Sequence, residues 1–143
     1  MLFRSWDGEP LLREQVNKLS VHDGIHFFGA VSESDLARLY RTARVFAMPS
    51  TREGFGLVLV EAARHGLPCI ACKYDAAREI ILHDQTGLLT EQHPHDIALA
   101  CIRLLTDDAD AERLGEAGRL RYWNNFRFTH FRERLLSSMG LDC

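Results

Sequence analysis

Two glutamates and two glycines lie close together near the middle of the chain, in a segment that joins two apolar runs. Glu53 and Gly54 come just before Gly56, and Glu61 follows in the next apolar run. Glycine tolerates positive φ and lets the backbone approach a ligand, and the amides that open a helix favour an anion such as phosphate. The segment therefore predicts a site for a phosphate-bearing ligand, although Gly-x-Gly spacing alone favours a simple turn and helix cap.

Glu61 is the only charged residue between Gly56 and Ala63. A helix that is apolar all round is expected to be buried, and a buried carboxylate needs hydrogen-bond donors. The vicinal hydroxyls of a ribose beside a phosphate would be suitable donors. Pairing with Arg64, or simple contact with water, explains the residue equally well, and both alternatives stay open at this point.

The elements that must position these residues alternate between short apolar runs and longer amphipathic ones, the pattern of β-α repeats around a parallel sheet. Strands are expected at Leu2–Ser5, Ile25–Phe28, Val45–Met48, Pro68–Ala71 and Leu88–Thr90. Helices are expected near Pro10–Leu19, Glu33–Thr42, Leu57–His65 and Ala77–His83. A helical C-terminal tail of about 94–139 follows, with helices near Pro94–Thr106, Ala109–Asn124 and Phe128–Met139. The expected fold is α/β, a Rossmann-like parallel sheet of about five strands with flanking helices and this tail.

Two helix boundaries have local signals. Ser32 stands three residues before Asp35, which predicts a Ser-x-x-Asp cap at the start of the second helix. Gly66 followed by Pro68 is typical of a helix stop and predicts the end of the third helix.

A chain of 143 residues with 46% hydrophobic residues, 26% charged residues and a net charge of −3 suits one ordinary globular domain, 1–143. No clustered basic surface is indicated, so nucleic acid is not an expected partner. No apolar run approaches the roughly 20 residues that a membrane span needs, and the expected location is the cytoplasm. Peripheral contact with the inner face of the membrane stays open, because a part of the protein outside this chain could carry it.

The cysteines and histidines are weak candidates for a metal or redox site. Cys69 and Cys72 form a C-x-x-C pair, but they fall in an expected buried strand, where residues three apart point to opposite faces. No second C-x-x-C supplies further ligands, so two buried thiols are the simpler interpretation. His93 and His95 flank a proline in a loop and are interpreted as a solvated turn. The C-terminal aromatic residues suggest core packing or docking against another domain.

The segment from Glu53 to Glu61, Glu-Gly-Phe-Gly-Leu-Val-Leu-Val-Glu, resembles the E-x7-E motif of glycosyltransferase family 4, retaining enzymes of the GT-B fold with two facing Rossmann-like domains. The resemblance extends through Ala62-Ala63 and Gly66-Leu67-Pro68, and most of the chain shares it. Ile25–Val31 resembles the family's strand and loop before the base pocket, and Thr86–Leu89 resembles a later strand.

The resemblance implies a role for each matching position. Glu53 would contact hydroxyls of the donor sugar and orient it rather than act as a nucleophile. The loop residues Gly54 and Phe55 would belong to the donor site, and the backbone amides of Gly56, Leu57 and Val58 would hold the diphosphate. Glu61 would bind the ribose. The residues that would flank the base are Gly29, Ala30 and Val31.

The implied activity is transfer of a sugar from a nucleoside diphosphate sugar to an acceptor hydroxyl with retention at the anomeric carbon. The acceptor would be a glycan or a lipid-linked sugar. Amides and basic side chains would neutralise the leaving diphosphate, so no metal and no cofactor are expected. The chain would be the donor-binding second half of such an enzyme, shortened at its N-terminal side and separated from the N-terminal acceptor domain.

The sequence departs from the family pattern in three respects. Trp6 stands where a Gly-x-Gly turn usually begins, the usual upstream Arg and Lys that clamp phosphate are missing, and the usual Gly-Gly-x-x-Glu appears as Asp75-Ala76-Ala77-Arg78-Glu79. A non-catalytic nucleotide-binding or partner-docking module and an inactive fragment therefore remain the alternatives to an enzyme. A sugar epimerase of the same fold is a more distant one.

Overall fold

The computed structural model describes residues 9–51, 54–74 and 76–140. The chain divides into two compact units, Met1–Leu39 and Tyr40–Cys143. The three-stranded sheet lies entirely in the second unit.

The first unit contains helix α1 (Glu9–Lys18), the short 3-10 helix η1 (His22–Gly24) and most of helix α2 (Glu33–Thr42). On α1, the guanidinium of Arg13 donates to Glu9 Oε1 at 2.9 and 2.6 Å and lies 4.2 Å from the centre of the Phe27 ring. The predicted Ser-x-x-Asp cap of α2 is confirmed, because the amide of Asp35 donates to Ser32 Oγ at 3.1 Å. Leu2–Ser5 lies outside the described residues.

The strand predicted at Ile25–Phe28 is wrong, because the structure assigns this segment to no strand. A strand is stable only when its backbone groups pair with a neighbouring strand. No described strand pairs with this segment, so its apolar pattern is not sufficient to form one.

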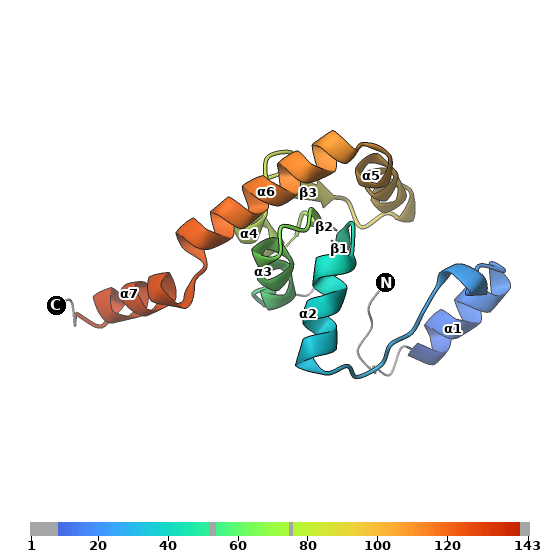
Figure 1. Cartoon of the computed structure of the whole chain (residues 1–143), viewed down its shortest axis with the longest axis horizontal. Coiled ribbons are helices and arrows are strands. Elements are labelled where there is room, and N and C mark those ends of the chain that lie inside the picture. The colour runs from blue at the N-terminus through green and yellow to red at the C-terminus, as the bar shows by residue number, and fades with distance from the viewer. Residues whose placement is uncertain (1–8, 52–53, 75, 141–143) are drawn as a thin grey trace. The chain divides into compact units, whose positions relative to one another are not determined.

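The second unit is built on a parallel sheet in the order β1 (Phe46–Met48), β2 (Cys69–Cys72), β3 (Gly87–Thr90), shown in Figure 1. Ala47 pairs with Ile70, and Ile70 pairs with Leu88. About five strands were expected and three are found in the described part of the chain. β2 is the middle strand and all four of its residues are buried.

Helices α3 (Leu57–Arg64), α5 (Pro94–Thr106) and α6 (Asp108–Asn125) pack against this sheet. The core joins the middle of the sheet to two of these helices, and it consists of Ile70, Leu88, Ala100, Leu104, Ala111 and Leu114. Leu104 and Leu114 are fully buried. Each such side chain contributes about 1.5–3 kcal/mol of apolar burial.

Helix α6 lies very close to the turn that ends α3. A Cβ atom placed on Gly115 would lie 2.2 Å from the backbone oxygen of Gly66, and one on Gly118 would lie 3.1 Å from the oxygen of Thr86. Since Cβ atoms essentially never approach so closely, Gly115 must lack a side chain for α6 to pack here. Gly66 itself has φ 75°, as the predicted glycine stop of α3 requires.

Helix α4 (Ala77–Ile80) is shorter than the predicted Ala77–His83. Ile81 is already extended, with φ −100° and ψ 123°, and the amide of Leu82 donates to Thr86 Oγ1 at 2.9 Å. The Thr86 hydroxyl therefore replaces the next helical hydrogen-bond acceptor, and the chain turns toward β3.

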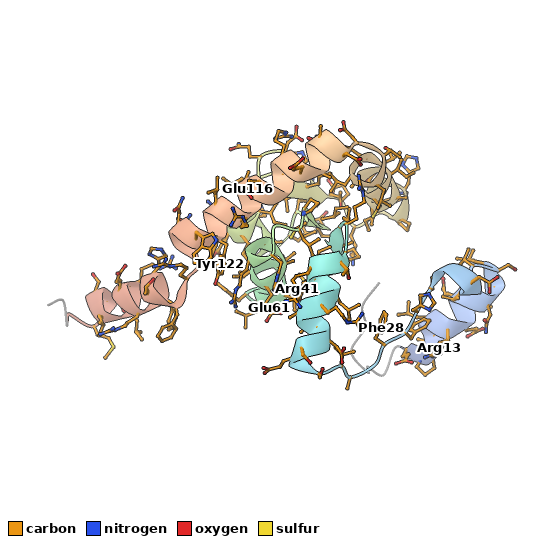
Figure 2. The ribbon with its side chains drawn as sticks, viewed as in Figure 1. Arg13, Phe28, Arg41, Glu61, Glu116 and Tyr122 are labelled. Atoms are coloured by element: carbon orange, nitrogen blue, oxygen red, sulfur yellow. The ribbon has the colours of Figure 1, made fainter. Side chains whose placement is uncertain are left out.

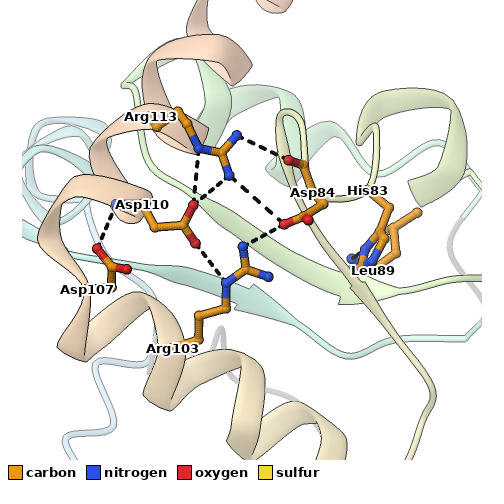
Figure 3. Close-up of polar contacts among 7 residues, drawn as sticks. All are labelled: His83, Asp84, Leu89, Arg103, Asp107, Asp110 and Arg113. Atoms are coloured by element: carbon orange, nitrogen blue, oxygen red, sulfur yellow. Dashed lines mark hydrogen bonds and ion pairs between the residues drawn. The ribbon is translucent and has the colours of Figure 1, made fainter.

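A charged network fixes the turn before β3 to the helices that follow it (Figure 3). Arg103 of α5 donates to Asp84 Oδ1 at 2.6 Å and to Asp110 Oδ2 at 2.7 Å. Arg113 of α6 donates to the same Asp110 and to the backbone oxygen of Asp84. The amide of Asp110 donates to Asp107 Oδ1 at 3.0 Å, which caps α6. This turn is therefore held by side chains from two helices.

The last helix, α7 (Phe128–Ser138), has no buried residue. Its apolar side chains are exposed, Phe128 at 76% and Phe131 at 56%. These aromatic residues are therefore not core residues of the described fold. Among the described residues, no helix is both long and apolar enough to cross a membrane.

Candidate functional site

The candidate site lies at the carboxyl edge of the sheet. Because the three strands are parallel, Met48, Cys72 and Thr90 end them at the same edge. The segment after β1 runs through Gly54 and Gly56 into α3, as predicted. Ligands of open α/β sheets bind at this edge.

The loop before α3 uses one of its two glycines for backbone conformation. Gly56, the N-cap of α3, has φ 79° and ψ 42°, in the left-handed region that favours glycine. Gly54 does not have a positive φ, and a Cβ there would meet no atom within 4 Å. Glu53 lies outside the described residues, so its predicted role is not placed. Phe55 is 46% exposed.

The first amides of α3 are available to a ligand. Gly56 accepts hydrogen bonds through its carbonyl oxygen, from the amides of Leu59 at 2.9 Å and Val60 at 3.4 Å. No side chain caps the helix, and among the described residues the amides of Gly56, Leu57 and Val58 have no hydrogen-bond acceptor. Leu57 and Val58 are also exposed, at 64% and 37%. Three donors without a described acceptor therefore lie at the positive end of an eight-residue helix, two of them on exposed residues and the third on the buried Gly56.

Glu61 is exposed, which favours the alternative in which its carboxylate contacts water over a buried carboxylate. Leu59, Val60, Ala62 and Ala63 are the buried residues of α3, and the exposed Leu57 and Val58 make the helix only partly apolar on its outer side. Glu61 projects from this helix in Figure 2. Among the described residues no ion pair joins it to Arg64.

Tyr40 holds the Glu61 carboxylate, a contact that the sequence analysis missed. The hydroxyl of Tyr40, a residue only 6% exposed, donates to Glu61 Oε2 at 3.1 Å. The Tyr40 ring stacks on His65 at 5.4 Å and lies 5.8 Å from the Phe46 ring. Burial, and then the charges of Arg64 and Arg41, lower the pKa of His65. Tyr40 lies on α2, and nothing in the sequence pairs it with Glu61 of α3.

The predicted base-flanking residues Gly29, Ala30 and Val31 lie in the first unit. Gly29 has φ 60°, and a Cβ there would meet no atom within 4 Å. Glycine therefore suits this turn because of its positive φ and not because a side chain would clash. The proposed contact of residues 29–31 with a nucleotide base stays a prediction.

A charged cluster occupies the same sheet edge, from the segments after β2 and β3. Lys73 and Glu91 form an ion pair, and the Tyr74 hydroxyl donates to Glu91 Oε2 at 2.5 Å. The hydrogen bond from Lys73 and then the one from Tyr74 lower the pKa of Glu91, and the hydrogen bond to Glu91 raises the pKa of Tyr74. No sequence pattern points to this cluster, because its members lie on two different segments.

The segment that replaces the family's two glycines is helical rather than glycine-like. Asp75 lies outside the described residues, and Ala76 has φ −63° and ψ −18° and is buried. This conformation is open to any residue. Arg78 is exposed on α4.

The thiols Cys69 and Cys72 are buried and free. Sγ of Cys69 donates to the Leu67 oxygen at 3.4 Å, and burial raises the pKa of this thiol to about 12. Among the residues that the structure describes, no three His, Cys, Asp or Glu side chains group as metal ligands would. The two cysteines are therefore structural residues of β2.

An open pocket of about 500 Å³ lies at the opposite edge of the sheet. Residues just before β1 and β2 line it, including Arg44 and Pro68. An ion pair between Arg44 and Asp108 joins two of its walls. Tyr40 and His65 also line this pocket, so the pocket adjoins the residues that hold Glu61.

Comparison with known proteins identifies the family. Residues 5–121 match the model of the glycosyl transferases group 1. The chain is 38% identical over 105 residues to a D-inositol 3-phosphate glycosyltransferase of Corynebacterium glutamicum. The aligned residues make up 73% of this chain and 25% of that protein. The chain thus spans about a quarter of the length of that relative.

Solved structures share the fold. A sucrose-phosphate synthase from Thermosynechococcus elongatus matches with a TM-score of 0.86 and 28% identity, over 96% of this chain and 37% of that one. HepE of Anabaena, solved in complex with UDP, matches with a TM-score of 0.88 and 22% identity, over 97% of this chain and 39% of that one. At that identity the HepE match shows the fold alone. With its family model covering most of its length, this chain belongs to the glycosyl transferases group 1 family.

Proposed function

We propose that this chain is the nucleotide-sugar-binding half of a two-domain retaining glycosyltransferase. The observation that carries the proposal is the start of α3, where three amides without a described acceptor follow the left-handed Gly56. The amides of Gly56, Leu57 and Val58 would hold the diphosphate of the donor. The UDP in the HepE structure supports nucleoside diphosphates as the probes to use.

Glu61 would bind the hydroxyls of the ribose. Its carboxylate is exposed and already oriented by the Tyr40 hydroxyl, while Oε1 has no described hydrogen-bond donor. A carboxylate of this kind accepts hydrogen bonds readily and leaves lone pairs for both ribose hydroxyls. Glu53 would orient the donor sugar, and Gly29, Ala30 and Val31 would flank the base.

Fixed backbone dipoles at α3 would stabilise the negative charge that develops on the leaving diphosphate as the glycosidic bond breaks. The sugar would pass to an acceptor hydroxyl of a glycan or a lipid-linked sugar, with retention at the anomeric carbon. The acceptor would be held by an N-terminal domain, and no metal would be needed. The exposed Phe55 and Leu57 would then line one wall of the cleft between the domains.

The test is calorimetric titration of the chain with UDP, GDP and ADP, beside Glu61→Ala and Glu112→Ala variants. One nucleotide should bind saturably, and Glu61→Ala should weaken it about 10- to 100-fold, the loss expected for hydrogen bonds to a charged group. Glu112, exposed on α6, supplies the matched control and should bind like the unmodified chain. Unchanged affinity in Glu61→Ala would contradict the ribose role. Failure of the folded chain to bind any of the three would contradict the donor site as a whole, and binding that survives EDTA would support a metal-free site.

A further inference from the structure

Tyr74 presents an exposed aromatic ring at the candidate site. It lies two residues beyond the carboxyl end of β2, the middle strand, and is 42% exposed. The segment on the neighbouring strand, after β1, leads to the free amides of α3, and adjacent strands are only about 4.8 Å apart. Tyr74 and the α3 amides therefore follow neighbouring strands at the same edge of the sheet.

Its neighbours fix Tyr74 in this position. The hydroxyl donates to Glu91 Oε2 at 2.5 Å, while Lys73 pairs with the other oxygen, Oε1. The backbone amide of Lys73 donates to the Thr90 oxygen at 2.9 Å, which extends the pairing of β2 with β3 past the strand ends. An exposed ring that is already ordered loses little conformational entropy when a ligand covers it.

The charges of the cluster cancel one another. Lys73 is paired with Glu91, which neutralises its charge and raises its pKa, and Arg78 of α4 is close enough for its charge to oppose that rise in the pKa of Lys73. Each oxygen of Glu91 already accepts one donor, and a carboxylate has about four acceptor positions, so further hydroxyls can still bind. The raised pKa of Tyr74 and the lowered pKa of Glu91 keep the donor protonated and the acceptor ionised at neutral pH. An aromatic face beside acceptors without net charge suits a neutral, hydroxyl-rich ring.

We propose that Tyr74 is the stacking platform for the sugar ring of the donor, with Glu91 as its positioning residue and as an acceptor for a sugar hydroxyl. The C–H groups of a pyranose would lie against the electron-rich face of the Tyr74 ring. This inference rests on the proposed function, because it takes the diphosphate at α3 as the anchor of the same donor molecule. It adds a residue that distinguishes a nucleotide sugar from a bare nucleotide.

The experiment compares each nucleotide with its sugar form: UDP with UDP-glucose, GDP with GDP-mannose, and ADP with ADP-glucose. Dissociation constants are measured by calorimetry for the unmodified chain, Tyr74→Ala, Tyr74→Phe and the control Phe128→Ala, which removes an exposed ring of α7. The variants are compared with the nucleotide that the unmodified chain binds and with the sugar form of that nucleotide. Thermal unfolding verifies that each variant is folded.

Tyr74→Ala should leave the affinity for the nucleotide within about twofold and weaken that for the nucleotide sugar by about three- to tenfold. Tyr74→Phe, which keeps the ring, should lose less, and Phe128→Ala should lose nothing. An unchanged ratio of the two affinities in Tyr74→Ala would overturn the platform while leaving the nucleotide site in place. If the folded, unmodified chain binds no nucleotide, the proposed function fails, and that outcome is distinct from a failure confined to Tyr74.

Discussion

At the scale of single residues, the Glu61 carboxylate depends on Tyr40 for its orientation. Tyr40→Phe removes the hydroxyl that donates to Glu61 and keeps the ring that stacks on His65. We expect nucleotide affinity to fall roughly three- to tenfold, the value of one neutral donor, with little change in stability. Calorimetry and thermal unfolding measure the two effects. Full affinity in the variant would show that Glu61 needs no help from Tyr40.

The buried thiol of Cys69 makes stability depend on alkaline pH. Its pKa is raised by burial to about 12, whereas an unfolded thiol titrates near 8.5. Between about pH 9 and pH 12 the unfolded chain releases this proton and the folded chain keeps it, so stability falls as pH rises. We expect the free energy of unfolding of Cys69→Ala to fall less steeply over this range in urea titrations. Parallel pH profiles for the two proteins would contradict the prediction, whatever their difference at pH 7.

Glu61 also shows the limit of sequence reasoning about a single side chain. The apolar residues around it predicted burial, but Leu57 and Val58 are exposed beside the site and do not pack in the core. Which apolar residues of a helix are buried depends on what packs against that helix. Apolar residues that stay exposed, as Leu57 and Val58 do, can contact the surface of another domain. The partner Tyr40 lies on a different helix, and nothing in the sequence connects the two.

At the scale of elements, α6 can pack only if position 115 has no side chain. A Cβ there would lie 2.2 Å from the Gly66 oxygen, and backbone atoms cannot move aside as a flexible side chain can. Gly115→Ala should therefore destabilise the fold by about 1–3 kcal/mol, even though alanine favours helices. Urea unfolding of Gly115→Ala beside Glu112→Ala, an exposed change on the same helix, tests this. Equal stability of the two variants would mean that the backbone at Gly66 moves enough to accommodate the added methyl group.

Elements with local signals were predicted well. The helix at Glu33–Thr42 is found with the predicted bounds, because the Ser32 cap is encoded within a few residues. Pro94–Thr106 also has its predicted bounds, beginning at a proline. Pairing between distant segments is not encoded in this way. Ile25–Phe28 has the composition of a strand but no described partner, and Lys73, Tyr74 and Glu91 come together only because β2 and β3 are neighbours.

At the scale of the whole molecule, the second unit contains the entire described sheet and its core. We expect a chain of residues 32–143, which keeps the Ser32 cap, to unfold cooperatively in urea. Its binding of the bare nucleotide should weaken if residues 29–31 flank the base as proposed. A shortened chain without a cooperative transition would show that the second unit needs the first for stability. Unchanged nucleotide affinity would remove the base role of residues 29–31.

The contact between Gly66 and Gly115 has a consequence for protein engineering. It fixes the C-terminal end of α3, whose other end carries the free amides, and an eight-residue helix is only about 12 Å long. A rigid rod of that length transmits a displacement at one end to the other. Libraries aimed at a new donor sugar should therefore vary the exposed Tyr74 and its neighbours and leave positions 66 and 115 as glycine. A shift there would weaken the proposed phosphate binding for every donor alike.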